Sequence, residues 1–181
     1  ILKTVRRRIK REKFDITFDL LQKNNVFCKI DLIIGLPGEK LDSIATTQEY
    51  MINKLENGSS HLLCCHVMRG LPGTELMDIA KQHDMVFSSE NEPHELIMSP
   101  DLPREDMLIA LRRTAVIFRL VNHTGWADRE MITERKSSDL SVREAFFSAK
   151  HRAGISSIAL VDHLVSGFHK RLEKTKSDFV K

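Results

Sequence analysis

One tetrapeptide, Gly-Leu-Pro-Gly, occurs twice in the chain and constrains the fold more than any other feature. The copies span residues 35–38 and 70–73, so they are offset by 35 residues (70 − 35). Each copy follows a run typical of a β-strand and precedes apolar residues at helical spacing. The offset is about the length of one strand–loop–helix unit. Two consecutive units predict parallel strands joined by crossovers, in an α/β layer or a barrel segment.

Apolar spacing places further elements around these turns. A helix over 12–25 precedes strands over 26–34 and 61–68, and helices over 39–57 and 74–83 follow the two turns. Alternation along the first strand separates its side chains into two faces. We expect the more apolar face to enter the core. That face carries Cys28, Ile30, Leu32 and Ile34, and the other carries Lys29, Asp31 and Ile33.

The second half of the chain is predicted to be helical. Residues 84–102 are rich in proline and acids, and we expect them to be irregular. A helix then begins at Pro103, runs to about Asn122 and is ended by Gly125. Its expected buried stripe consists of Met107, Leu108, Leu111, Ala115, Phe118 and Val121.

Two shorter helices are predicted to follow the long one. Ser141 and Glu144 form a capping-box signature for a helix that runs to about Arg152. A last helix starts near Ser157. The polar residues 128–139 are interpreted as a linker.

Composition excludes some classes of protein. With 41% hydrophobic and 29% charged residues in 181, the chain can bury a core. The longest uncharged apolar run, 32–37, is too short to cross a bilayer, and no apolar segment follows a basic start closely enough to be read as a secretory signal, so we expect no membrane partner. Three cysteines without framework spacing fit a reducing, cytoplasmic location. Because the chain begins with Ile1 in a helix-like pattern, we expect it to be a fragment.

Basic residues gather at both ends of the chain. Residues 1–13 hold seven Lys/Arg against one acid, and residues 169–181 hold five against two. Such ends either contact nucleic acid or are solvated helix faces. Residues 1–13 contain no aromatic residue for base stacking and residues 169–181 only Phe179, which favours the solvated faces.

The turns indicate where a ligand would bind. Ligands of parallel α/β folds bind at the carboxyl ends of the strands, where helix N-termini also point amide donors. Neither turn has the spacing of a phosphate loop or of a dinucleotide fingerprint. Asp31, mid-strand among apolar residues, either binds a polar ligand group or pairs with Lys29.

A dense group of potential metal ligands occurs in the second strand: His61, Cys64, Cys65 and His66. On a strand, Cys64 and His66 face one way while His61 and Cys65 face the other. The four cannot grip one ion, so we interpret the cysteines as core residues and expect no metal site here.

Two sequence runs resemble the radical S-adenosylmethionine superfamily. They are KIDLIIGLPGE at 29–39 and HVMRGLPGTEL at 66–76, and they are most similar to the branch that often carries a cobalamin-binding domain. The segment 2–8 looks like the helix before the fifth barrel strand of that branch. Residues 95–126 are similar to the helical extension after the barrel, whereas 127–181 resemble no known segment.

The resemblance implies a partial (β/α) barrel of TIM-barrel type. A [4Fe–4S] cluster on a CxxxCxxC loop would cleave S-adenosylmethionine to a 5′-deoxyadenosyl radical. Here, the adenine and ribose would be lined by Ile33, Gly35, Leu36, Pro37, Gly38 and Glu39, and the other side would be closed by His66, Met68 and Leu71. Asp31 stands at the first glycine of the family's GxIxGxxE pattern, and Glu39 falls one position late.

The sequence departs from the family in one decisive respect: it contains no CxxxCxxC and no D-x-H-x-x-G cobalamin motif. We therefore expect the last two βα units of a barrel (1–88), the family's helical extension (89–126) and a helical segment (127–181), inactive alone. No catalytic residue or metal ligand is assigned. The implied partners are the remainder of its own barrel and a small-molecule or peptide substrate, and cobalamin is possible in the full protein. The alternative is a cluster-free α/β module that docks on a protein partner.

Overall fold

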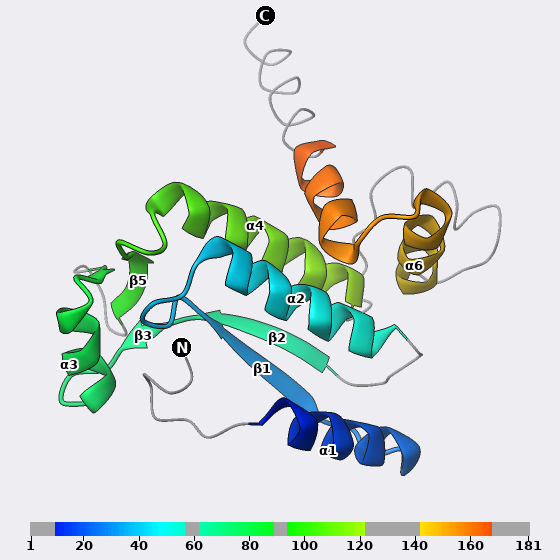
Figure 1. Cartoon of the computed structure of the whole chain (residues 1–181), viewed down its shortest axis with the longest axis horizontal. Helices are drawn as coiled ribbons and strands as arrows, with labels where there is room; N and C mark the ends of the chain where they lie inside the picture. The colour runs from blue at the N-terminus through cyan, green and yellow to red at the C-terminus, as the bar shows by residue number, and fades with distance from the viewer. Residues whose placement is uncertain (1–9, 57–61, 89–93, 122–141, 168–181) are drawn as a thin grey trace, which may run out of the picture. The chain divides into compact units, whose positions relative to one another are not determined.

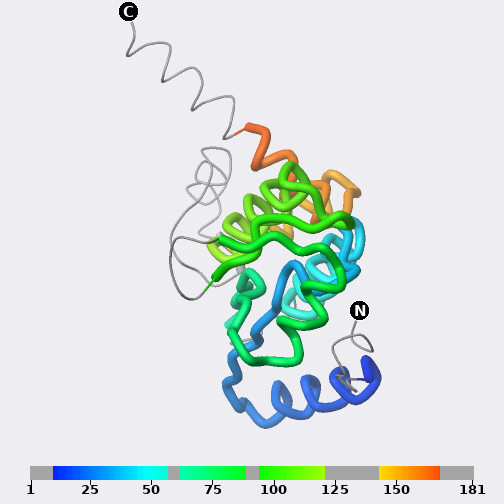
Figure 2. Tube along the Cα trace, turned by 90° about the vertical axis from the view of Figure 1, so that its left-hand side faces the viewer, coloured from blue at the N-terminus to red at the C-terminus, as the bar shows by residue number. Residues whose placement is uncertain are grey.

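The computed structural model describes residues 10–56, 62–88, 94–121 and 142–167 and has a mixed α/β architecture (Figure 1). The first half of the chain forms α1 (Arg11–Lys23), β1 (Lys29–Ile34), α2 (Leu41–Leu55) and β2 (Leu62–Val67). The passage from α1 into β1 can be followed in Figure 2. These elements confirm the helix–strand–helix–strand order predicted from the sequence. The first strand begins three residues later than expected, at Lys29.

β1 and β2 pair in parallel, as the repeated turn predicts. The register runs from Lys29 opposite Leu62 to Ile34 opposite Val67. A hydrogen bond of 2.8 Å from the Met68 amide to the Ile34 carbonyl continues the pairing. Both strands therefore end at the same edge of the sheet, and each Gly-Leu-Pro-Gly turn lies just beyond that edge.

The two faces of the β1/β2 pair differ sharply in character. On one face, Ile30, Ile34 and Leu63 are buried. The opposite face, called the open face below, consists of Lys29, Asp31, Ile33, Leu62, Cys64 and His66, and its side chains are exposed or half-buried. The buried face contributes to a core cluster that consists of Ile34, Ile44, Met68, Ala80, Met85, Leu96, Leu102, Met107 and Ala110.

A second, antiparallel sheet follows β2 and corrects the sequence-based prediction. After the short β3 (Arg69–Gly70) and the expected helix α3 (Glu75–Gln82), the chain forms β4 (Val86–Phe87) and β5 (His94–Met98), in the order β3-β5-β4. The prediction that 84–102 is irregular was wrong for both strands. Only Leu96 of β5 is buried, so the sequence lacks a strand's alternation, and the strand exists because its backbone pairs with distant residues.

The long helix α4 (Arg104–Val121) has the predicted bounds but buries only part of the predicted stripe. Leu108 and Phe118 are exposed, and so is Ala115. The side chain of Val121 lies outside the description. Met107 is buried as predicted, and Leu111 is partly buried against the core cluster. The helix also buries Ala110, Ile117 and Leu120. Apolar residues occur all around this helix, so periodicity alone does not fix which stripe faces the core.

The last described elements are α6 (Val142–Ala153) and a helix over 157–167, both expected from the sequence. Gly154, with a φ of +64°, ends α6 in the left-handed conformation common after helices. The expected cap Ser141, the stop Gly125, the linker 128–139 and the ligand candidate His61 lie outside the described residues.

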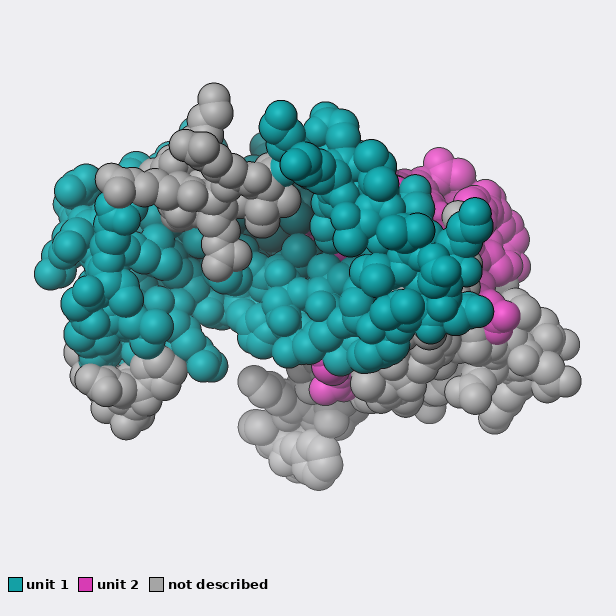
Figure 3. Space-filling model, turned by 90° about the horizontal axis from the view of Figure 1, so that it is seen from below, with its two compact units in different colours: residues 1–47, 58–111 teal, residues 48–57, 112–181 magenta. Residues whose placement is uncertain are grey.

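Contacts divide the chain into two compact units, coloured separately in Figure 3. Unit 1 consists of 1–47 and 58–111, and unit 2 of 48–57 and 112–181. The expected division at 88 and 126 stays a prediction. Among the described residues, no helix combines the length and apolar character needed to cross a membrane.

Candidate functional site

The Leu-Pro-Gly part of each Gly-Leu-Pro-Gly run, with the residue after it, forms a turn of the same geometry. The first glycines differ, because Gly35 has a φ of +89° and Gly70 lies in β3. Glu39 donates its amide to the Leu36 carbonyl at 2.9 Å, and Thr74 donates to Leu71 at 3.2 Å. Gly38 and Gly73 both have a φ of +77°. In the four-residue turns Leu36–Glu39 and Leu71–Thr74, proline is the second residue and the glycine with a positive φ is the third. This combination is the signature of a type II β-turn. The expected pair of equivalent glycine turns at a common edge is therefore present in unit 1.

The side chain of Glu39 folds back onto the first turn and binds its backbone. One oxygen of its carboxylate, Oε2, accepts hydrogen bonds from the Gly35 amide at 2.6 Å and from the Leu36 amide at 3.2 Å. The residue is 7% exposed. Burial raises the pKa of Glu39, and the two backbone hydrogen bonds only partly oppose that effect. Glu39 therefore occupies the amides that a ligand would otherwise use.

Gly35 makes a close approach between the turn and β5. Its φ is +89°, and a Cβ at this position would lie 2.3 Å from Cδ2 of Leu96. Pro37 and Met68 are also fully or almost fully buried. The side chains of Pro37, Glu39 and Met68 are thus buried, and their role in binding a cofactor stays a prediction.

The remaining predicted site residues are accessible. Leu71 is 54% exposed on the second turn, and Ile33 is 38% exposed at the end of β1. Asp31 and His66 lie on the open face, and the turn residues Leu36 and Gly38 are half-buried. The structure therefore gathers six of the ten candidates on one edge and the adjoining face of unit 1. Their role in binding a cofactor stays a prediction.

A polar cluster occupies the open face. Asp31 Oδ1 lies 3.0 Å from Lys29 Nζ and 2.8 Å from His66 Nε2. These hydrogen bonds, His66 first and Lys29 second, lower the pKa of Asp31, and the same contact raises that of Lys29. The pairing with Lys29 was one of the two alternatives for Asp31. The contact between Asp31 and His66 was not predicted. The offset between these two residues is 35, the same as the offset between the two Gly-Leu-Pro-Gly runs.

The described residues do not fit an iron–sulfur cluster. They contain no group of three metal-ligating side chains. As expected, Cys64 shares the open face with His66, whereas Cys65 packs against the core cluster. Burial raises the pKa of the Cys28 thiol, which disfavours the thiolate that binds iron. No chemistry of a cluster can be assigned to this chain's own residues.

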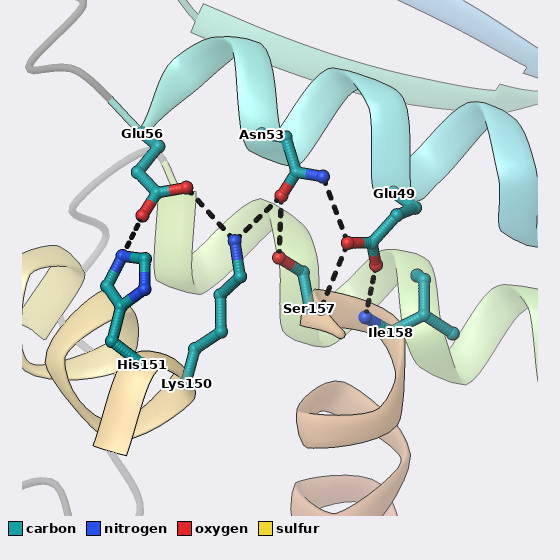
Figure 4. Close-up of polar contacts among 7 residues, drawn as sticks. All are labelled: Glu49, Asn53, Glu56, Lys150, His151, Ser157 and Ile158. Carbon is teal, nitrogen blue, oxygen red and sulfur yellow. Dashed lines mark hydrogen bonds and ion pairs between the residues drawn. The ribbon is translucent and has the colours of Figure 1, made fainter. Parts of the chain in front are cut away.

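Unit 2 contains a polar network that the sequence reasoning missed (Figure 4). Glu49, Asn53 and Glu56 recur at i, i+4 and i+7 along α2 and its end, a spacing that places them on one helix face. Asn53 Oδ1 accepts hydrogen bonds from Lys150 Nζ and Ser157 Oγ, each at 3.0 Å. The spacing of these three polar residues on one helix face was the sign of the network that the sequence offered.

The two acids of this network have different roles. Glu49 accepts the amides of Ser157 at 3.1 Å and Ile158 at 2.7 Å, the first two residues of the 157–167 helix. Glu56 is bound by Lys150 at 3.0 Å and by His151. Burial raises the pKa of Glu56, but these two partners outweigh it, so the net pKa is lowered. The network holds the C-terminal helices on α2.

Neither the models of known protein families nor the curated proteins compared with this chain gave a match. The case for a function therefore rests on the geometry of the described residues.

Proposed function

We propose that this chain supplies part of a radical S-adenosylmethionine enzyme: the wall of the cofactor pocket that faces the adenine, together with helices on the substrate side. In this proposal the β1/β2 pair is the end of a partial (β/α) barrel. The open face points into the barrel, and the two glycine turns form the rim on which the nucleoside lies.

One observation carries the proposal: the parallel β1/β2 pair, whose two Leu-Pro-Gly turns follow the strands at one edge. Parallel strands of this kind bind ligands beyond their carboxyl ends. Beside the turns, exposed Ile33 and Leu71 offer the apolar contacts that an adenine ring needs.

The cluster itself would be held by cysteines outside the given sequence, because Cys28, Cys64 and Cys65 do not have the required spacing. The same holds for cobalamin, for which the sequence has no motif. The chain's own contribution is therefore binding and orientation rather than the radical step.

Ile33 provides the sharpest test of this pocket. In the full protein, reconstituted with iron and sulfide without oxygen, Ile33→Asp is expected to weaken S-adenosylmethionine binding about tenfold or more, because a carboxylate would replace an apolar contact with the adenine. Equilibrium binding of S-adenosylmethionine measures the loss.

Ile109 is the matched control for this variant. It lies on α4 in the same unit, and its exposure, 37%, nearly equals the 38% of Ile33. Ile109→Asp should leave binding unchanged. Equal binding by wild type and Ile33→Asp, or equal losses in both variants, would contradict the proposed pocket.

A second function is favoured by the exposed apolar side chains around α1. Ile16, Leu20 and Phe27 are 68%, 58% and 61% exposed. Contiguous exposed apolar patches mark surfaces for protein partners, and Ile16 and Leu20, four residues apart on α1, lie on one face of that helix. They support a cluster-free α/β module that docks on another protein. Iron and sulfide content after anaerobic reconstitution of the full protein separates the two functions: stoichiometric iron supports the enzyme, and its absence supports the module.

A further inference from the structure

The contacts of Asp31 determine which ring nitrogen of His66 carries the proton. An ionised carboxylate only accepts hydrogen bonds, and Asp31 Oδ1 already accepts one from Lys29. The ring nitrogen Nε2 of His66, 2.8 Å from the same oxygen, must therefore be the donor. In the neutral imidazole the proton then sits on Nε2, and Nδ1 keeps its lone pair.

The open face leaves two acceptors without a partner among the described residues. His66 Nδ1 makes no hydrogen bond there, and neither does Asp31 Oδ2, because both contacts of that carboxylate use Oδ1. The side chains of His66 and Asp31 are 48% and 46% exposed, so a ligand can reach them. A face with two free acceptors recognises a group that donates, such as O–H or N–H.

The occupant of this face must carry polar groups for Lys29, Asp31 and His66, which lie beside the apolar Ile33 and Leu62. Parallel sheets are normally covered on both faces. An apolar helix or strand packed on this face would remove the charges of Lys29 and Asp31 from water without offering hydrogen bonds in return. Such burial costs free energy. A small polar molecule that lies along β1 and β2 meets both requirements, because it covers the face and satisfies its acceptors.

We propose that Asp31 and His66 form a proton-accepting dyad for the substrate. Nδ1 of His66 takes the proton of a substrate O–H or N–H group, and the electron pair of the broken bond stays on the substrate oxygen or nitrogen. The imidazolium that forms is stabilised by the Asp31 carboxylate. The dyad rests on the proposed function only in that the substrate lies beside the cofactor pocket. Its substrate class is a molecule with an ionisable hydroxyl or amine.

Diethyl pyrocarbonate, which reacts with an unprotonated imidazole nitrogen, is the probe for the exposed lone pair. On the full chain, peptide mass spectrometry gives the rate at each histidine. At about pH 8, where an ordinary imidazole is mainly unprotonated, we expect Asp31→Asn to slow the reaction of His66 severalfold, because loss of the carboxylate makes the ring nitrogen less basic and hence a weaker nucleophile. The rate at His163 should not change.

Two controls accompany this measurement. Glu95→Gln removes an exposed carboxylate that contacts Arg69 in the same unit and should leave the His66 rate unchanged. Nitrogen-15 NMR of the ring should find the proton on Nε2 in wild type. Equal His66 rates in wild type and Asp31→Asn, or a proton on Nδ1, would overturn the dyad. Neither readout needs iron or S-adenosylmethionine, so failure of the proposed function would be seen separately.

Discussion

Glu39 and Thr74 occupy the same place after the two Gly-Leu-Pro-Gly turns, yet they stabilise them differently. Thr74 donates its hydroxyl to the Leu71 carbonyl at 2.7 Å, on the surface. Glu39 instead reaches back to the amides of Gly35 and Leu36 in a buried setting. The shared backbone geometry therefore comes from proline and glycine, whereas the residue after the turn decides how accessible the preceding amides are.

Gly35 and Gly38 should differ in their tolerance of alanine. Both have a positive φ, which costs an L-residue about 1–2 kcal/mol. At Gly35 the new methyl group would also overlap Leu96, which adds about 1–3 kcal/mol. Urea denaturation should therefore give a larger loss of unfolding free energy for Gly35→Ala than for Gly38→Ala, where nothing lies within 4 Å. Equal losses would mean that the turn does not pack on β5 as described.

Glu39 should make stability depend on pH. Its folded pKa lies above the ordinary value of about 4.3, so the folded state binds the proton more tightly than the unfolded state. This contribution is fully present below the ordinary pKa and is lost as pH rises through the folded pKa. In urea denaturation at a series of pH values, wild type should lose stability relative to Glu39→Gln as pH rises from about 4. Parallel pH curves would contradict a buried, raised-pKa carboxyl.

At the scale of elements, the start of the 157–167 helix shows how side chains from two segments share one task. Ser156 Oγ accepts the amide of Ala159 at 3.1 Å, as an N-cap residue does. The two preceding amides, of Ser157 and Ile158, donate hydrogen bonds to the carboxylate of Glu49 in α2. A carboxylate at a helix N-terminus also interacts favourably with the helix dipole.

Removal of this carboxylate should weaken unit 2. Glu49→Ala is expected to lower the unfolding free energy by about 1 kcal/mol, the usual loss for a helix cap. Hydrogen exchange of the Ser157 and Ile158 amides should become faster. Thr47→Ala, at an exposed position of the same helix, is the control and should leave both amides protected. Unchanged exchange in Glu49→Ala would show that these amides do not depend on Glu49.

For the whole molecule, the sequence predicted the elements whose information is local. The repeated turn was sufficient for the parallel β1/β2 pair, and apolar spacing was sufficient for the bounds of α4. What depended on distant residues was missed. β5 forms through pairing with Arg69–Gly70 and Val86–Phe87, and the buried side of α4 depends on its neighbours.

The same distinction between local and long-range information applies to the candidate site. Its location at the carboxyl edge followed from the order of elements along the chain. The engagement of Glu39 with its own turn and the contact between Asp31 and His66 did not, because each depends on side-chain geometry. Spacing in a sequence places residues on a strand or turn, but not the atoms that they contact.

The division of α2 between the two units has a consequence for how the gene can change. The boundaries fall after residues 47, 57 and 111, so the polypeptide passes from one unit to the other three times. A single recombination breakpoint cannot exchange one unit and leave the other whole. Both must be inherited together, and a truncation inside α2 would deprive each unit of one of its own segments.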